Sequence, residues 1–342
     1  MLASDKASQT TDSPENLGAL FSKLAPQFTA LDRFTSGQIS QFEPEIREPV
    51  SYCLQSGGKR IRPALVFMAG WQCEENAFDD LVQLAAVIEM VHLATLVHDD
   101  IMDEASIRRN RSTAAVKFGP HTSVLLGDAL FAQAVLITTR FPSTLVCRHV
   151  SESTRKVCAG EIMQTLEQRH GRPSLESYRR VIDLKTAELF YLSCHLGATL
   201  AGFPESFALA AGQFGRRLGV AYQIYDDLAD FFGREDRIGK TLGTDFAQGK
   251  CTLPMLILLE QSDKKESSAI LEELRTGSTL GFDERVAQMM KGGVFDTVST
   301  TIRQEIEAAE TSLQAYQDRP AARELLRFSS MLRVQLNGLR SD

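Results

Sequence analysis

The chain has 342 residues, and with 43% hydrophobic and 24% charged residues it has the composition of an ordinary globular protein with a large core. The net charge of -7 argues against a nucleic-acid partner, because such a partner requires a basic binding face. The six cysteines include no C-x-x-C pair, and no apolar run is expected to span a bilayer, so we predict a cytoplasmic protein with reduced thiols and no stable membrane anchor.

Apolar residues recur at helical spacing along almost the whole chain. Residues 1–15 are polar and acidic and are predicted to form a disordered lead before a single helical domain over residues 16–342. A long helix beginning at Asp79 is apolar on nearly every face, which indicates a central position in the fold. In the first part of the chain, the other helices are expected at about 16–35, 38–55, 64–73 and 124–139.

Helices continue through the second part of the chain. They are expected at about 143–169 and 175–202, from Pro204 to a second acidic cluster, and again from Leu253 to the C-terminus. A loop rich in glycine and charged residues separates the last two of these, over residues 233–250. No stretch alternates convincingly with period two and no clean linker is present, so we predict an all-α fold with one domain.

Two acidic clusters each close a long apolar helix. Both have the pattern Asp-Asp-x-x-Asp, as Asp99-Asp100-x-x-Asp103 and as Asp226-Asp227-x-x-Asp230. On a helix the first and last aspartates share one face, and their repulsion destabilises an isolated helix by roughly 0.2–0.5 kcal/mol. Bound cations would remove this repulsion, and Mg²⁺ commonly binds one or two carboxylates together with substrate phosphates.

Three groups of cationic residues accompany the acidic clusters: Lys59 and Arg62; Arg108 and Arg109; and Lys185, Lys240 and Lys250. Acidic and basic groups above apolar helices are typical of a site for an amphiphile with a polyphosphate head and a hydrocarbon tail. Neither a nucleophile in a Ser-His-Asp arrangement nor a Walker loop is visible in the sequence. The residues therefore favour ionisation of a C–O bond over attack by a protein nucleophile.

The same residues belong to an ordered set of motifs that runs from Gly57 to Pro254. They are Gly57-Gly58-Lys59-Arg60-Ile61-Arg62-Pro63; His92 with His98-Asp99-Asp100-Ile101-Met102-Asp103; Arg108-Arg109; Gly127-Asp128; Gly160-Glu161-x-x-Gln164; Lys185-Thr186-Ala187; Gln223-x-x-Asp226-Asp227-x-x-Asp230; Gly239-Lys240; Gly243-x-Asp245; and Gly249-Lys250-x-Thr252-Leu253-Pro254. With these motifs the chain resembles the trans (E-type) polyprenyl diphosphate synthases. It departs from the family at Asn110, where a glycine is usual after the arginine pair, and we expect an altered turn there with intact phosphate ligands.

The resemblance implies a fold and a reaction. The fold is the single-domain helical bundle of the isoprenoid synthase type around a deep central cavity, assembled as a homodimer. The reaction is the Mg²⁺-dependent head-to-tail condensation of isopentenyl diphosphate with an allylic diphosphate, which gives a medium or long all-trans prenyl diphosphate. In it the isopentenyl double bond attacks an allylic cation, and the departing diphosphate removes the proton, so that no protein base is needed.

The resemblance also implies roles for individual residues. About three Mg²⁺ ions would clamp the allylic diphosphate, and the implied metal ligands are Asp99, Asp103, Asp226, Asp227 and Asp230. The implied allylic diphosphate ligands are Arg108, Lys185, Lys240 and Lys250. The implied isopentenyl diphosphate ligands are Lys59, Arg62, His92 and Arg109. Thr186 and Gln223 would stabilise the developing cation, and the implied catalytic set is Asp99, Asp103, Lys185, Thr186, Gln223 and Asp226.

The length of the product is expected to depend on the helix that carries Asp99. Ala94 and Thr95 lie just over one turn before it, and one turn rises about 5.4 Å, which is close to the length of one isoprene unit. Both side chains are small, so a prenyl tail should pass this level, and the resemblance implies that small residues here accompany products longer than farnesyl. The floor of the channel is expected deeper, at Phe131, Val135 or Met163, and the sequence does not choose among them.

Three other interpretations compete with this one. A class I terpene cyclase would share the helical fold, but it usually has an Asn/Ser/Glu-type second metal motif and would not need Lys59 and Arg62. A non-catalytic partner subunit would lack some of the aspartate or arginine ligands, and none is missing. A di-metal carboxylate bundle would need two Glu-x-x-His pairs, and Glu89-x-x-His92 is a single match.

Overall fold

The computed structural model describes residues 17–170, 173–235 and 242–340, and most of these residues are helical. The predicted lead over residues 1–15 and the predicted ligand Lys240 lie outside the described residues. The first helices are α1 (Leu17–Lys23), α2 (Ala25–Ile39), α3 (Arg47–Leu54), α4 (Ile61–Ala69), α5 (Phe78–Met102), α6 (Ala114–Phe118), α7 (Pro120–Thr138) and α8 (Leu145–His170). They are followed by α9 (Leu175–Ile182), α10 (Glu188–Leu200), α11 (Glu205–Phe232), α13 (Thr244–Ala247), α14 (Leu253–Gln261), α15 (Lys264–Thr276), α16 (Phe282–Lys291), α17 (Val294–Ser312) and α18 (Pro320–Arg340).

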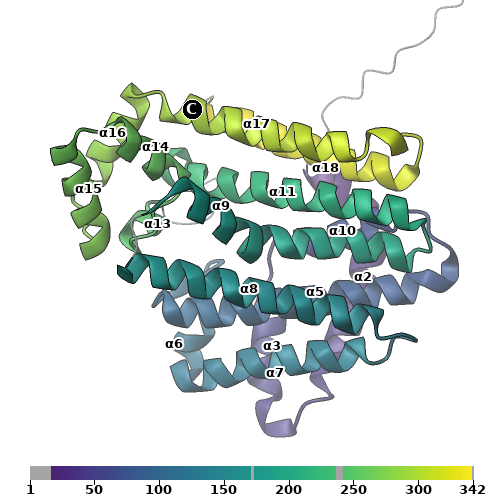
Figure 1. Cartoon of the computed structure of the whole chain (residues 1–342). Coiled ribbons are helices and arrows are strands. Elements are labelled where there is room, and N and C mark those ends of the chain that lie inside the picture. Colours follow the sequence, from purple (N-terminus) through teal and green to yellow (C-terminus); the bar gives the residue numbers. More distant parts are fainter. Residues whose placement is uncertain (1–16, 171–172, 236–241, 341–342) are drawn as a thin grey trace, which may run out of the picture.

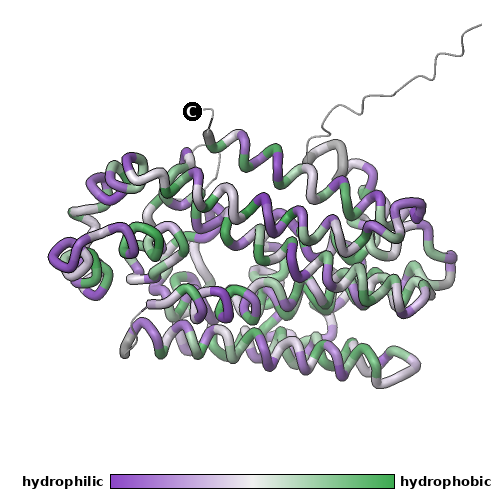
Figure 2. Tube along the Cα trace, turned by 45° about the horizontal axis from the view of Figure 1, so that its top comes forward, coloured by the Kyte–Doolittle hydropathy of each residue, from purple (hydrophilic) through white to green (hydrophobic). Residues whose placement is uncertain are grey.

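Helix α5 lies at the centre of the fold, as its apolar composition predicts. It packs against α7, α4, α2 and α10. In Figure 1 the long helices follow one another in layers, from α7 through α5 and α8 to α10 and α11, and then to α17 and α18. Along the outer helices in Figure 2, hydrophobic and hydrophilic residues alternate, as expected for helices with one buried face. Most of the buried hydrophobic residues form one cluster with members from Leu24 to Leu336.

Helices α5 and α7 are both long and apolar enough to cross a membrane, judged by length and composition alone. The expectation that no apolar run is long enough to span a bilayer is therefore wrong. In α5, 67% of the most hydrophobic window is buried inside the protein, which identifies it as a core helix. In α7 this share is 44%, because one side of the helix is exposed. The apolar character of α5 therefore reflects packing within this fold.

A short hairpin follows α5 and was not predicted from the sequence. Strand β1 (Ile107–Arg108) pairs antiparallel with β2 (Arg111–Ser112) through a two-residue turn. Both turn residues have positive φ, 53° at Arg109 and 58° at Asn110, as a type I′ turn requires. Asparagine tolerates this conformation better than most residues do, so Asn110 fits where the family usually has glycine.

The helix predicted over residues 175–202 is present, but it contains a π-helical turn. The turn covers Asp183–Ala187 and lies between α9 and α10. Lys185 and Thr186, two of the predicted catalytic residues, are in this turn. π-Turns inside α-helices are rare and often occur at functional sites.

Candidate active site

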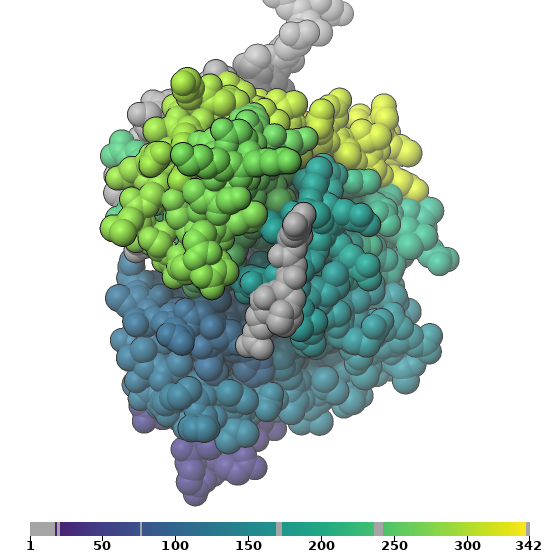
Figure 3. Space-filling model, turned by 60° about the vertical axis from the view of Figure 1, so that its left-hand side comes forward, coloured from purple at the N-terminus to yellow at the C-terminus, as the bar shows by residue number. Residues whose placement is uncertain are grey.

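A cavity with a volume of about 1800 Å³ is bordered by residues of α5, α8, α11, the π-turn and the hairpin. Residues of α15 reach its rim, and in Figure 3 the green α15–α16 region lies above the blue surface of the first half of the chain. The cavity brings together most of the predicted site residues: Lys59, Arg62, His92, Thr95, Asp99, Asp103, Arg108, Arg109, Phe131, Lys185, Thr186, Gln223, Asp226, Asp227 and Lys250. Four predicted residues are not part of its lining: Ala94, Asp230, and the candidate floor residues Val135 and Met163.

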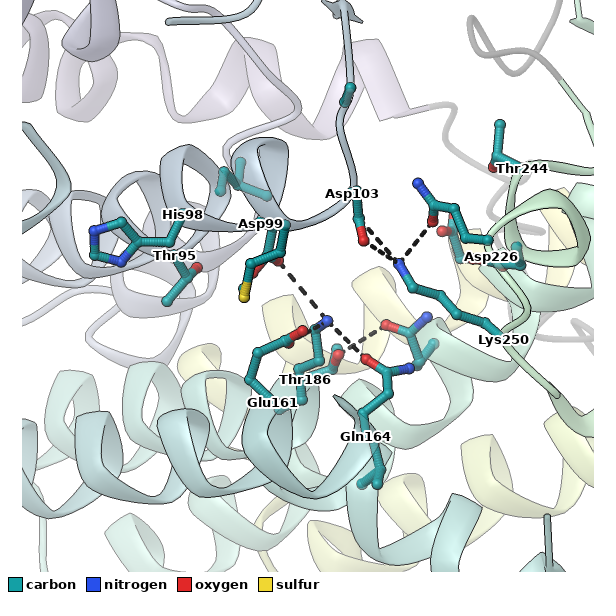
Figure 4. A pocket seen from close by; sticks show the side chains of 18 of the residues that line it. Thr95, His98, Asp99, Asp103, Glu161, Gln164, Thr186, Asp226, Thr244 and Lys250 are labelled. Atoms are coloured by element: carbon teal, nitrogen blue, oxygen red, sulfur yellow. Dashed lines mark hydrogen bonds and ion pairs between the residues drawn. The ribbon is translucent and has the colours of Figure 1, made fainter. Parts of the chain in front are cut away.

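The two acidic clusters face each other across this cavity. Asp99 and Asp103 come from the C-terminal end of α5, and Asp226 comes from α11 on the other side, as Figure 4 shows. The Lys250 ammonium extends between them and donates hydrogen bonds to both oxygens of Asp103, at 3.1 and 3.0 Å. The sequence prediction that both clusters serve one site agrees with this geometry.

The Lys185 ammonium is held among three acceptors from two helices, α8 and α5. It forms an ion pair with Glu161 of α8, lies 3.8 Å from Asp99 Oδ2, and donates a 3.0 Å hydrogen bond to Gln164 Oε1. Burial disfavours the charge on Lys185, but Asp99 and Glu161 outweigh this effect and raise its pKa. Sequence reasoning assigned no role to Glu161 or Gln164, although their spacing of three residues on a helix places them on one face.

The environment of Asp99 is less favourable for a negative charge. Burial raises the pKa of Asp99 to about 6, although the nearby Lys185 ammonium opposes the shift. The carboxylates of Glu161 and Asp103 add to the shift by repulsion. A divalent cation beside Asp99 and Asp103 would relieve this repulsion, which is the behaviour expected of metal ligands.

In the second acidic cluster Asp226 and Asp227 border the cavity, while Asp227 and Asp230 also accept hydrogen bonds from buried protein groups. Asp227 is buried and accepts hydrogen bonds from Tyr178 Oη at 2.6 Å and Gln223 Nε2 at 2.8 Å. Burial raises the pKa of Asp227 to about 8, followed by repulsion from Asp245. Tyr178 and Asp245, which also border the cavity, were given no role in the sequence analysis.

Asp230 is fully buried and organises the loop that precedes α14. It accepts hydrogen bonds from Thr244 Oγ1 and from the Asp245 backbone N–H, each at 3.0 Å. Its position away from the cavity lining makes Asp230 less suited to direct metal binding than Asp226, and its assignment as a metal ligand stays a prediction. Asp226 and Asp227 both border the cavity, but Asp227 is only 2% exposed and accepts hydrogen bonds from Tyr178 and Gln223, so it is better placed to orient Gln223 than to bind a metal.

Thr186 and Gln223 are connected to this buried network. The Thr186 hydroxyl donates a 2.7 Å hydrogen bond to Gln223 Oε1, and Gln223 Nε2 donates in turn to Asp227. Because its proton is used in this bond, the hydroxyl oxygen of Thr186 offers lone pairs to the cavity. Fixed oxygen dipoles of this kind stabilise a positive charge without reorganising.

The cationic residues form two neighbouring sets at the hairpin. Arg108 Nε donates a 2.5 Å hydrogen bond to Asp100, which fixes this guanidinium at the end of α5. The next residue, Arg109, packs against Gly58, where a Cβ atom would lie 2.4 Å from the guanidinium carbon. A side chain at Gly58 would displace the Arg109 guanidinium, so this packing accounts for Gly58, whereas a Cβ atom on Gly57 would meet nothing within 4 Å.

Arg62 and Arg109 retain unused hydrogen-bonding capacity. Among the described residues, Arg62 Nε and Arg109 Nη1 are buried and have no hydrogen-bond acceptor. Both side chains line the cavity together with His92, and burial followed by the charge of Arg62 lowers the pKa of His92 well below its usual value. A neutral imidazole beside two guanidinium groups suits an anionic ligand, because buried N–H donors normally have acceptors.

The three residues expected to limit product length are separated by the structure. Thr95 and Phe131 line the cavity together with the apolar residues Val124 and Ile162. Ala94 is 0% exposed in the hydrophobic core and does not line the cavity. Thr95 rather than Ala94 therefore forms the cavity wall, because one residue along a helix corresponds to a rotation of about 100°, and an effect of Ala94 on product length stays a prediction.

Comparison with known proteins identifies the family. The family model for polyprenyl synthetase matches residues 43–291. The chain belongs to the polyprenyl synthetase family. This membership confirms the predicted resemblance to trans polyprenyl diphosphate synthases and the predicted class of enzyme, a prenyltransferase.

Curated relatives of this polyprenyl synthetase include synthases of long prenyl chains. It is 32% identical over 295 residues to the all-trans-nonaprenyl-diphosphate synthase (geranyl-diphosphate specific) of Rhodobacter capsulatus, covering 86% of this chain and 90% of the relative. It is 34% identical over 272 residues to the octaprenyl diphosphate synthase of Escherichia coli, covering 79% of this chain and 83% of the relative.

Solved structures of this family share the fold. The polyprenyl synthase of Caulobacter crescentus, described in complex with calcium and isoprenyl diphosphate, superposes with a TM-score of 0.86 at 27% identity, over 94% of this chain and 98% of that one. The decaprenyl diphosphate synthase of Rhodobacter capsulatus gives a TM-score of 0.85 at 29% identity, over 94% and 99%. The predicted all-α fold of the isoprenoid synthase type is thus confirmed.

Proposed function

We propose that this polyprenyl synthetase condenses isopentenyl diphosphate head-to-tail with an allylic diphosphate, in a Mg²⁺-dependent reaction that gives a medium or long all-trans prenyl diphosphate. The observation that carries the proposal is the meeting of two acidic helix ends and the cationic groups at one cavity with an apolar wall. The charged groups match two diphosphate heads and the apolar wall matches a hydrocarbon tail. The names of the nonaprenyl and octaprenyl relatives support a product of this length.

The carboxylates at the cavity fit Mg²⁺ bound jointly with a substrate. Asp103 already faces a cation, the Lys250 ammonium, and Asp99 and Asp226 line the same space. Among the described residues, no three histidine, cysteine or acidic side chains form a ready-made metal cage. Mg²⁺ usually keeps several waters and takes further ligands from substrate phosphates, so a few carboxylates at the cavity are enough to bind it with a diphosphate. We assign about three Mg²⁺ ions to these carboxylates, where they would neutralise charge on the departing diphosphate.

Each of the two sets of cationic residues would bind the diphosphate of a different substrate. Arg108, Lys185 and Lys250 surround the Asp99–Asp103 end of the cavity and would bind the allylic diphosphate. Isopentenyl diphosphate would bind at the other set, which consists of Lys59, Arg62, His92 and Arg109. Thr186 would stabilise the allylic cation with its hydroxyl oxygen, while the buried Asp227 network holds Gln223 in place.

The decisive experiment is an incubation of the purified full chain with labelled isopentenyl diphosphate, Mg²⁺ and geranyl, farnesyl or geranylgeranyl diphosphate. Products of increasing length, sized by chromatography and abolished by EDTA, would support the proposal. Release of a cyclic hydrocarbon from the allylic diphosphate alone would identify a terpene cyclase, and no turnover would indicate a non-catalytic subunit. Asp99→Ala should abolish turnover, whereas Asp79→Asn at the other end of α5 should not.

We also propose a homodimer formed through α7. This helix exposes large apolar side chains to solvent, with exposed fractions of 67% for Leu125, 52% for Leu136 and 43% for Val135. Burying such a face against a second copy would remove it from water. Sedimentation should report a dimer for the unaltered chain and a monomer for Leu125→Glu. Leu280→Glu, between α15 and α16, is the control because Leu280 is 98% exposed. The cytoplasmic location remains a prediction from composition.

A further inference from the structure

The π-turn that carries Lys185 and Thr186 is closed by a hydrogen bond between its ends. The backbone N–H of Glu188 donates to the carbonyl of Asp183, five residues earlier, where an α-helix would bond to the fourth. The π-turn therefore contains one residue more than an α-helical turn. Each residue of an α-helix is rotated by about 100° from the previous one, so a change from the π-turn to an α-turn would alter the direction of the side chains in this segment. The direction of Lys185 and Thr186 therefore depends on this turn.

The helices on both sides of the π-turn approach it at backbone distance. A Cβ atom on Gly160 of α8 would lie 2.8 Å from the backbone nitrogen of Lys185. A Cβ atom on Gly219 of α11 would lie 2.7 Å from the Cα atom of Ala187. This packing gives the turn little space to relax sideways, but it does not connect the two ends of the turn to each other.

One arginine of α11 makes that connection. Arg216 Nε donates to Asp183 Oδ1 at 2.7 Å, and Arg216 Nη2 donates to Glu188 Oε2 at 2.8 Å. These are the same two residues that the π hydrogen bond joins. The Arg216 guanidinium also lies 5.6 Å from the centre of the Tyr191 ring, which limits its movement.

The Glu188 carboxylate is anchored independently of Arg216. It is 1% exposed, and its Oε1 accepts hydrogen bonds from Ser153 at 2.9 Å and Lys156 at 2.8 Å, both on α8. The Asp183 side chain is 37% exposed, so water can solvate its carboxylate when Arg216 is absent. Loss of Arg216 would thus leave one carboxylate paired and the other in water, and the fold should survive.

We propose that Arg216 is a positioning residue, which clamps Asp183 and Glu188 so that the π-turn directs Lys185 and Thr186 into the cavity. Arg216 is not among the residues that line the cavity and so acts through these two neighbours. Its kinetic consequence rests on the proposed function, because Lys185 would bind the allylic diphosphate and Thr186 would stabilise the cation. The clamp itself is a property of the structure and can be tested without turnover.

The test compares Arg216→Met with Arg217→Met. Arg217 is the next residue of α11, but it pairs with Glu305 of α17 at 3.1 Å and does not touch the π-turn. Both substitutions remove one positive charge from α11, with two ion-pair partners lost at Arg216 and one at Arg217, so the free energy of unfolding of both variants should be measured alongside the kinetics. We expect Arg216→Met to lower kcat about 10- to 100-fold, as displaced catalytic groups commonly do, and to raise KM for the allylic diphosphate. KM for isopentenyl diphosphate should change little, and Arg217→Met should resemble the unaltered enzyme.

Two further measurements separate positioning from a merely structural role. Arg216→Lys keeps a charge that reaches one carboxylate, so it should restore part of kcat. In a Lys185→Gln background, Arg216→Met should cause a much smaller additional loss, because the clamp then has less to position. Equal kinetics for the two arginine variants, or equal increases in KM for both substrates, would overturn the inference and leave the proposed function intact.

Hydrogen exchange provides a readout that needs no activity. The backbone amides of residues 184–190 should exchange faster in Arg216→Met than in Arg217→Met. If Arg216→Met does not fold, the same comparison can be made with Asp183→Asn. Unchanged exchange in this segment would reject the clamp. If the unaltered chain shows no turnover, the proposed function fails, and the exchange experiment still decides about Arg216.

Discussion

The Lys250 ammonium lies 3.0 Å from Asp103 Oδ2 and 3.1 Å from Oδ1, and so joins two residues that are 147 positions apart. This ion pair brings the loop before α14 onto the C-terminal end of α5. Both side chains are mostly buried, with exposures of 13% for Lys250 and 22% for Asp103. An interaction between partly buried charges is screened less by salt than a surface pair.

The first prediction concerns Lys250→Met, which keeps the length of the side chain and removes its charge. Loss of a hydrogen bond to a charged group weakens binding about tenfold or more, so KM for the allylic diphosphate should rise by at least this factor. Steady-state kinetics with each substrate varied in turn will measure it. Lys291→Met, at the exposed end of α16, is the control. An unchanged KM would show that Lys250 pairs only with Asp103.

The second prediction concerns the length of the product. Thr95→Phe places an aromatic ring on the cavity wall and should shorten the products, as measured by chromatography of the extracted prenyl chains. Ala94→Phe places the same ring in the closed core and should lower the free energy of unfolding by about 1–3 kcal/mol, because overpacking strains its neighbours. If Ala94→Phe shortens the product and Thr95→Phe does not, the assignment of the cavity wall is wrong.

The third prediction compares two adjacent glycines. Gly57 and Gly58 both have positive φ, 70° and 142°, so alanine is strained at either position. A Cβ atom meets nothing within 4 Å at Gly57, whereas at Gly58 it meets the Arg109 guanidinium at 2.4 Å. Gly58→Ala should therefore raise KM for isopentenyl diphosphate well above the value for Gly57→Ala. Similar values for both variants would mean that the position of Arg109 does not matter for this substrate.

The fourth prediction is a dependence of stability on pH. Hydrogen bonds from Arg285, at 2.9 and 2.7 Å, hold the pKa of Glu273 below its ordinary value of 4.5. A lowered pKa in the folded state gives stability that is present above 4.5 and is lost as the pH falls through the lowered value. Glu273→Gln should cost about 2 kcal/mol at neutral pH, because Arg285 is buried, and this difference should shrink in acid.

Chemical denaturation at a series of pH values will measure this difference. Glu272→Gln is the control, since Glu272 pairs with Arg275 on the exposed side of α15. Surface pairs of this kind contribute little to stability. A constant difference between the unaltered chain and Glu273→Gln from neutral to acid pH would contradict the assignment of Glu273.

Much of this architecture could be read from periodicity and local chemistry. The apolar run before Asp99 predicted the central position of α5, and the paired Asp-Asp-x-x-Asp motifs predicted that two distant helix ends meet at one site. These predictions succeeded because they depend on composition and on spacing along a helix. Neither quantity requires knowledge of the neighbouring helices.

The failures are those in which tertiary packing decides. The π-turn at Lys185 inserts one residue without changing the helical pattern, and strands of two residues, such as Ile107–Arg108, are too short to show alternation. The choice between Ala94 and Thr95 depends on how α5 is rotated against its neighbours. The burial of Asp230 depends on contacts with Thr244 and Asp245, which lie beyond α11 in the sequence. The two acidic motifs have the same sequence pattern, so the pattern alone does not show that the last aspartate is buried in the second motif.

The tight turn at Arg109 and Asn110 has a consequence for substrate pairing. Arg108 is fastened to Asp100, while Arg109 rests on Gly58, so neighbouring residues of one hairpin serve the two diphosphate subsites proposed for this enzyme. The peptide unit between Arg108 and Arg109 therefore carries one ligand for each of the two proposed substrates. Any shift of the hairpin should move the two bound diphosphates together. The position of one substrate relative to the other would then be preserved, while the distance from both substrates to the carboxylates would change.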